Sequence, residues 1–123
     1  MTAASLDVVA VGNAIVDIIA AADDALIDAE GLTKGGMQLV DAARADVLYG
    51  KMGTAHEISG GSAANTIAGM AALGRKCGFI GQVADDQFGK VFSHDIRAIG
   101  VDFTTPMRGE EPPTAQCLIF VTP

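Results

Sequence analysis

The fold is decided by residues 60–74, GGSAANTIAGMAALG. A glycine pair is followed by small and apolar residues at helical spacing and by a closing glycine, so the stretch predicts a helix that Ser62 caps and Gly74 ends. Its small side chains allow close approach to a sheet. The glycine pair leaves bare backbone and unpaired N–H donors at the helix start, which suits hydroxyl groups or anions; a role in packing alone is the alternative.

Strands and helices alternate on both sides of this stretch. Residues 7–12 and 77–83 are short apolar runs, typical of buried strands. A short helix is expected over residues 23–31, and Asp41 and Asp86 are placed to begin two further helices. The alternation predicts an α/β fold with a mostly parallel sheet.

Further short strands need not belong to that sheet. They are predicted at about 14–21, 36–41, 55–59, 103–108 and 114–121. The first of them carries a carboxylate, Asp17, among β-branched neighbours, and this placement needs a reason. One is a binding role; the alternative is an edge-strand charge that discourages aggregation.

Composition excludes several classes of protein. The chain has 123 residues, which suits one compact domain, and 50% of them are hydrophobic, which excludes a disordered acidic tail. Fifteen acidic against eight basic residues, a net charge of −7, argue against binding nucleic acid or an anionic membrane. No apolar run reaches the roughly 18 residues of a membrane helix, and the start lacks a basic signal region, so a cytoplasmic location is expected.

Cysteine and histidine usage gives no metal signature. Cys77 and Cys117 stand in apolar surroundings, which predicts buried, reduced thiols. His56 and His94 are isolated, and no CxxC or HxxxH spacing occurs, so no metal site is expected.

Polar and glycine residues from separate segments together describe a sugar pocket: Asn13, Asp17, Gly60, Gly61 and Asn65. The side chains of Asn13 and Asp17 share a face if their strand is continuous. A carboxylate accepts hydrogen bonds from two vicinal hydroxyls, and amides both donate and accept. The alternative reading makes Asn65 an ordinary first-turn helix residue. Neither a phosphate-binding GxxxxGK[ST] loop nor a dinucleotide fingerprint is present.

Four motifs follow one another along the chain: Val11-Gly12-Asn13 with Asp17 downstream, residues 60–65, Leu73-Gly74, and residues 83–89. Their order and spacing resemble those of the ribokinase-like (PfkB) carbohydrate kinases, which phosphorylate a sugar or nucleoside hydroxyl with ATP. Within that family they are most similar to adenosine kinases and their bacterial sugar-kinase relatives.

The resemblance implies a ribokinase-like α/β fold, here a partial, mostly parallel sheet flanked by helices with a small β-sheet lid. It assigns substrate binding to the residues around the glycine pair: Asn13, Asp17, Gly60, Gly61, Ser62 and Asn65. Asp17 would bind ribose hydroxyls, and the glycines would let the sugar lie against backbone. Thr114 falls in the segment that resembles the lid, which would exclude water during phosphoryl transfer.

The resemblance also implies ATP and Mg²⁺, whose main binding residues lie in the family's C-terminal half. No Gly-Ala-Gly-Asp-like segment occurs in residues 1–123, so no catalytic residue is assigned to this chain. It is expected to be the N-terminal part of a PfkB kinase domain, inactive alone, binding a small sugar or nucleoside, with adenosine favoured. Self-association through the lid or an uncovered sheet edge is a further expectation. The alternatives are a non-catalytic nucleoside- or sugar-binding module and a purely structural α/β module.

Overall fold

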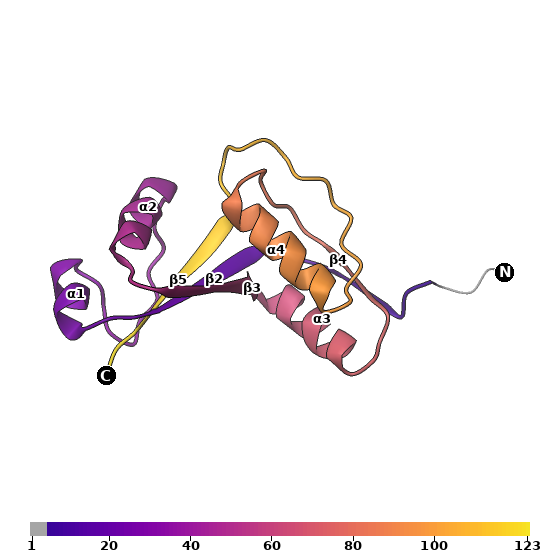
Figure 1. Ribbon diagram of the computed structural model, residues 1–123, viewed down its shortest axis with the longest axis horizontal. Helices are drawn as coiled ribbons and strands as arrows, with labels where there is room; N and C mark the ends of the chain where they lie inside the picture. Colours follow the sequence, from indigo (N-terminus) through magenta and orange to yellow (C-terminus); the bar gives the residue numbers. More distant parts are fainter. Residues whose placement is uncertain (1–4) are drawn as a thin grey trace.

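Strands and helices alternate along residues 5–123, the part of the chain that the computed structural model describes (Figure 1). In chain order the elements are β1 (Val8–Val11), β2 (Ile15–Ala21), α1 (Asp24–Ala29), α2 (Ala42–Lys51), β3 (Ala55–Gly60), α3 (Ser62–Ala72), β4 (Cys77–Ile80), α4 (Gln87–Ala98) and β5 (Ala115–Val121).

The strands form two separate sheets. Strands β1 and β4 pair in parallel, with Val8 opposite Cys77. The other sheet has the strand order β3-β2-β5, in which β2 is antiparallel to β3 and parallel to β5. In Figure 1, helices α3 and α4 lie side by side near the β1–β4 pair, and α1 and α2 lie at the far end of the three-stranded sheet. The α/β architecture with a parallel pair and a second, small sheet is confirmed.

One hydrophobic core joins the two sheets. Three phenylalanines stand at its centre, with ring centroids 5.4 Å apart for Phe92 and Phe103, and 5.7 and 6.0 Å from these two to Phe79. Val16 and Ile18 of β2 are fully buried in the same core. Because β2 contributes to the core that also supports β1 and β4, the small sheet is held at its base by ordinary core packing.

The predicted helix starts at the aspartates are confirmed. Asp23, Asp41 and Asp86 each accept a hydrogen bond from the backbone N–H three residues ahead, at 2.8, 2.8 and 2.7 Å. The prediction for Ser62 is wrong. Gly61 is the N-cap of α3, at φ +97°, and makes no side-chain bond, because this left-handed turn needs a glycine and moves the helix start by one residue.

Two of the five extra strands predicted from sequence do not form. Residues 36–41 are an irregular loop after Gly35, which is at φ +74°, and Met37 and Leu39 are 81% and 92% exposed, with no partner strand beside them among the described residues. Residues 103–108 contain Pro106, which cannot donate to a ladder, and a single isolated bridge, from Ala84 to Arg108, takes the place of a strand there. The other three segments are strands β2, β3 and β5.

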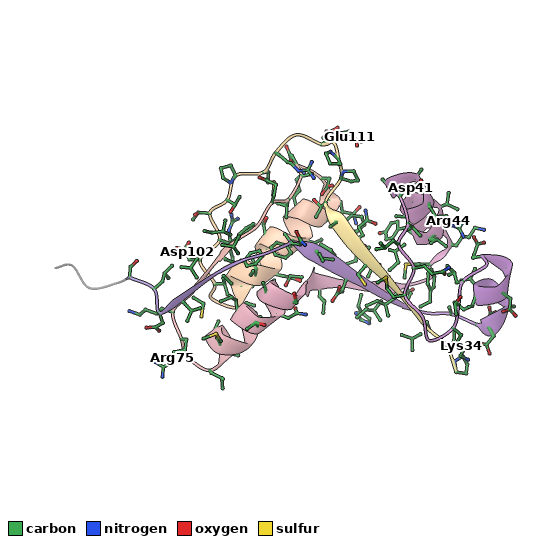
Figure 2. The ribbon with its side chains drawn as sticks, turned by 180° about the vertical axis from the view of Figure 1, so that it is seen from behind. Lys34, Asp41, Arg44, Arg75, Asp102 and Glu111 are labelled. Atoms are coloured by element: carbon green, nitrogen blue, oxygen red, sulfur yellow. The ribbon has the colours of Figure 1, made fainter. Side chains whose placement is uncertain are left out.

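Charged side chains hold the far end of the three-stranded sheet. The guanidinium of Arg44 on α2 donates to the Glu30 carboxylate at 2.9 Å and to the Glu30 carbonyl at 2.8 Å, and Lys51 pairs with the same carboxylate. Lys34 Nζ donates to Asp24 at 2.8 Å and to the carbonyl of Pro123 at 3.0 Å; Figure 2 shows Lys34 beside the end of the chain and Arg44 on α2.

Burial separates the two cysteines. Cys77 is buried in β4, as predicted, but Cys117 is exposed on β5, so the prediction that both are buried is wrong. The face of the small sheet that carries Cys117 is not covered by a helix among the described residues. No helix within residues 5–123 is long and apolar enough to cross a lipid bilayer.

Candidate functional site

The side chains of β2 alternate between a buried face and an open one. Val16 and Ile18 are 0% exposed and point into the core, so Asp17 between them faces the other way. In the register of the sheet, Asp17 lies opposite Ile58 of β3 and opposite Cys117 of β5. The carboxylate therefore stands in the middle of the small sheet, on its less buried face.

We call this the open face of the small sheet. Its members alternate along the three strands and are mostly apolar: Ile15, Asp17, Ile19, His56, Ile58, Gly60, Ala115, Cys117 and Ile119. None of the three strands contains a lysine or an arginine. Glu57, the other carboxylate of these strands, belongs to the opposite face, where it accepts a 2.6 Å hydrogen bond from the Tyr49 hydroxyl. Asp17 is thus the single carboxylate of the open face.

The glycine pair touches this carboxylate and the chain that precedes it. A β-carbon at Gly60 would lie 2.5 Å from Cγ and 2.6 Å from Oδ1 of Asp17, so a side chain at position 60 would displace the carboxylate. A β-carbon at Gly61 would lie 2.7 Å from the carbonyl oxygen of Asn13. Close approach explains the first glycine, and close approach together with the φ of +97° explains the second.

The structure brings together Asn13, Asp17, Gly60 and Gly61, but not in the way a continuous strand would. Strand β2 begins at Ile15, so Asn13 lies in the connection from β1. The strand is not continuous from Asn13 to Asp17, which was the condition for a shared face. Residues 12–14 connect the two sheets. Asn13 reaches the site with its carbonyl, and its side chain is exposed.

Ser62 and Asn65 lie on the first turn of α3, next to the glycine pair. Both are exposed, and the backbone N–H of Asn65 donates to the carbonyl of Gly61 at 2.8 Å. They adjoin the glycine pair in the chain, and in the described residues neither makes a hydrogen bond to Asp17.

Thr114 is placed differently from the other residues that the sequence singles out. It is 2% exposed, directly before β5, and its hydroxyl donates to Asp86 Oδ1 at 2.7 Å and accepts from the Ala84 N–H at 2.9 Å. Thr114 is therefore enclosed at the base of the small sheet. Sequence reasoning gave Asp86 only a helix cap and missed this contact, because the two residues are 28 positions apart and no local pattern connects them.

Burial raises the pKa of the Asp17 carboxyl, and within the described residues no hydrogen bond or neighbouring cation offsets that effect. A carboxylate that has lost part of its water without gaining a protein donor retains its full capacity to accept hydrogen bonds. Two neighbouring hydroxyl groups of a ligand can satisfy it, and such charge-assisted bonds are stronger than neutral ones.

The metal ion that the family resemblance implies needs a cluster of ligating side chains. Within residues 5–123 no group of three or more histidine, cysteine or acidic side chains could hold a metal ion. Asp86 already accepts three hydrogen bonds from protein groups. The described residues therefore offer Mg²⁺ no cluster of ligands.

The fold and the site together define an α/β protein in which one carboxylate, set over a glycine pair at a helix start, can take up neighbouring hydroxyl groups. The chain belongs to the pfkB family of carbohydrate kinases, whose family model matches residues 6–123. The family and the ribokinase-like fold expected from the sequence are confirmed.

Solved and curated relatives agree on the family. The chain is 55% identical to an adenosine kinase from Sinorhizobium meliloti, with a TM-score of 0.84 over 97% of this chain and 36% of that one. It is 54% identical to a probable sugar kinase from Rhizobium etli CFN 42, with a TM-score of 0.83 over 95% and 36%. A 43-residue stretch is 51% identical to the 5-dehydro-2-deoxygluconokinase of Halalkalibacterium halodurans, covering 35% of this chain and 13% of that protein. The chain spans about a third of the length of the solved relatives and much less of the curated one.

Proposed function

We propose that this chain supplies the sugar-binding side of an ATP-dependent kinase that phosphorylates a hydroxyl of a ribose-type substrate, with adenosine as the favoured substrate. The observation that carries the proposal is the Asp17 carboxylate, which rests against Gly60 on a sheet face that holds no other carboxylate. In this reading Asp17 accepts hydrogen bonds from two vicinal ribose hydroxyls, and the bare backbone at Gly60 and Gly61 lets the sugar ring lie close.

The character of the open face favours a nucleoside over a sugar acid. The isoleucines on either side of Asp17, such as Ile15, Ile19 and Ile58, offer apolar contact for a flat base. The sugar acid named in the 5-dehydro-2-deoxygluconokinases carries a carboxylate, and the three strands provide no lysine or arginine to pair with it. An unpaired anion beside Asp17 would be unfavourable.

The small sheet is the proposed lid. Its open face would cover the bound sugar and exclude water, which limits hydrolysis of the phosphate donor. ATP and Mg²⁺ would supply the transferred phosphate and the charge that stabilises it, and no group of three or more potential metal ligands lies within residues 5–123. We expect the 123-residue chain to bind its substrate without phosphorylating it.

A non-catalytic binding module is the second candidate. It is favoured by the contacts within the described residues, which bring Asn13, Gly60 and Gly61 together around Asp17. The two candidates share the same binding site and differ in whether a phosphate-transfer part acts with it.

Two experiments test the proposal. Adenosine, ribose and 5-dehydro-2-deoxygluconate are titrated into the 123-residue chain and followed by NMR, with Asp17→Asn as the loss variant and Asp46→Asn, an exposed aspartate on α2, as the matched control. We expect saturable shifts with adenosine that Asp17→Asn removes and Asp46→Asn retains. Flat titrations with all three compounds would refute the binding site.

The second experiment places the chain in the context of a whole relative. Residues 6–123 replace the equivalent segment of the Sinorhizobium meliloti adenosine kinase, to which they are 55% identical. The proposal expects adenosine-dependent ATP consumption by the chimera, lost in Asp17→Asn. A folded chimera that binds adenosine but consumes no ATP would favour the non-catalytic module.

A further inference from the structure

Aspartate side chains of helix α4 and its N-cap bond to strand β3 and to the residue just before strand β5. The sheet has the order β3-β2-β5, so β3 and β5 flank β2, the strand that carries Asp17. Helix α4 packs against β2 and β3 from the side opposite the open face. Its two aspartates, Asp86 at the N-cap and Asp95 in the third turn, both accept hydrogen bonds from backbone groups of the outer strands or of the residue just before them.

Asp86 makes more bonds than a helix cap requires. A cap needs one acceptor, which here is Oδ1 accepting from the Gly89 N–H at 2.7 Å. The same carboxylate accepts from the Thr114 hydroxyl at 2.7 Å and from the Thr114 N–H at 2.8 Å. The Thr114 hydroxyl in turn accepts from the Ala84 N–H at 2.9 Å. Thr114, directly before β5, is thus bonded both to the N-cap of α4 and to the loop that precedes this helix. We call these bonds the anchor.

The residues around the Asp86–Thr114 bonds are closely packed. A β-carbon at Gly89 would collide with the carbonyl oxygen of Ala84, so the first turn of α4 lies directly on the loop that also bonds Thr114. Thr114 is 2% exposed, so loss of its Asp86 bonds would leave buried polar groups without their partner, which is costly. Three positions further along β5, Cys117 lies opposite Asp17. The anchor therefore fixes the strand that forms one wall beside the carboxylate.

Asp95 holds the other wall. Strand β3 is an edge strand of the described sheet, and the backbone N–H of Ser59 donates to Asp95 Oδ2 at 2.9 Å. The next residue is Gly60, on which the Asp17 carboxylate rests. Asp95 and Asp86 thereby act on opposite sides of Asp17 without touching the open face.

We propose that Asp86 and Asp95 are positioning residues for the sugar site, which act through the backbone at Thr114 and Ser59 to set the spacing of β5 and β3 around Asp17. The effect on ligand binding rests on the proposed function, whereas the effect on the spacing of the strands does not. The small sheet is then fixed to α4 at Ser59 and Thr114. When the lid closes, the part of the sheet beyond these two residues bends, and the sheet does not slide over α4.

The test uses the whole 123-residue chain and Asp86→Asn. Asparagine caps a helix as well as aspartate does, so the Gly89 bond is kept, while an NH₂ group replaces an oxygen that accepted from Thr114. Amide hydrogen exchange measured by NMR reports on the strands with or without a ligand. We expect exchange at residues 115–117 to accelerate by about five- to thirtyfold relative to β1 and β4. The carboxyl titration of Asp17 should move toward its ordinary pKa, and adenosine should bind more weakly.

Further variants separate positioning from general stability. Thr114→Val keeps the shape of the side chain but lacks the hydroxyl, so it should accelerate exchange in β5 as Asp86→Asn does. Thr114→Ser keeps the hydroxyl and should show the wild-type exchange pattern. Asp95→Ala should accelerate exchange at residues 59–60. Ser93→Ala is the matched control: it removes a buried 2.8 Å hydroxyl bond within α4 that does not reach the sheet. It should leave the exchange ratio and the Asp17 titration as in wild type.

The outcomes are distinguishable from failure of the proposed function. Wild-type chain that does not bind adenosine counts against that function, while exchange and the Asp17 titration still decide the positioning role. Exchange that rises equally in β1, β4 and β5, or an Asp17 titration unchanged in Asp86→Asn and Thr114→Val, would overturn it. An adenosine affinity unchanged despite faster exchange in β5 would overturn it as well.

Discussion

Replacing Gly60 with alanine tests the central contact of the site. A β-carbon there would lie 2.6 Å from Asp17 Oδ1, and ordinary contacts of such atoms begin near 3.4 Å, so the oxygen must move by 3.4 − 2.6 = 0.8 Å or more. A hydrogen bond of normal length is lost over such a displacement. A bond to a charged group contributes about 1.5–3 kcal/mol, so Gly60→Ala should weaken adenosine binding roughly ten- to a hundredfold.

The fold should tolerate this change. Gly60 is not among the glycines with positive φ, so alanine fits its backbone, and the strain falls on a side chain that can rotate away. We expect the free energy of unfolding to change by no more than about 2 kcal/mol. The assay pairs an adenosine titration with thermal unfolding. Gly69→Ala on α3, where a β-carbon meets nothing within 4 Å, is the control and should keep full affinity. Wild-type affinity in a folded Gly60→Ala chain would refute the contact between carboxylate and substrate.

Three further predictions concern stability. Burial raises the pKa of Asp17 in the folded chain. The contribution of Asp17 to the free energy of unfolding is therefore complete below the ordinary pKa and is lost as the pH rises through the pKa of the folded chain. Asp17→Asn should unfold at a higher temperature than wild type at pH 7, and the difference should vanish in acid. Burial acts to raise the pKa of Asp86, but the hydrogen bonds from Thr114 and Gly89 outweigh it and lower the pKa. The contribution of Asp86 to the free energy of unfolding is therefore present above the ordinary pKa and is lost as the pH falls through the pKa of the folded chain. Asp86→Asn should make the free energy of unfolding, measured with urea, less dependent on pH in acid. Phe92→Ala, at a 0% exposed position, should cost about 3–5 kcal/mol by the same urea measurement, and a loss under 1 kcal/mol would contradict the shared core.

The elements that local chemistry specifies could be predicted from the sequence. The three aspartate caps follow from a side chain that bonds a backbone group three residues ahead, and the buried strands follow from apolar runs. The loop at 36–41 could not be predicted, because its alternating residues suit a strand and only the lack of a partner strand in the described chain prevents one.

The residues of the candidate site could be predicted from the sequence, but the contacts between them could not. Asp17 stands out as a carboxylate in an apolar strand, and the glycine pair stands out before a helix, so the pattern and the family resemblance single them out together. That the carboxylate rests on Gly60 depends on the register of β2 against β3, which no local pattern specifies. Exposure of Cys117 depends on which face of β5 is covered, and that strand carries mostly apolar residues on both faces.

The unequal burial of the two cysteines makes the wild-type chain suitable for site-selective labelling. Cys77 is enclosed in β4, while the Cys117 thiol is accessible and lies directly across from Asp17. A thiol-reactive fluorophore should attach at Cys117 without mutagenesis, and more quickly under alkaline conditions, since burial and then the charge of Asp17 raise the pKa of this thiol. The dye would sit beside the carboxylate, so its emission would report occupancy of the open face, and a ligand bound there would shield the thiol from the reagent.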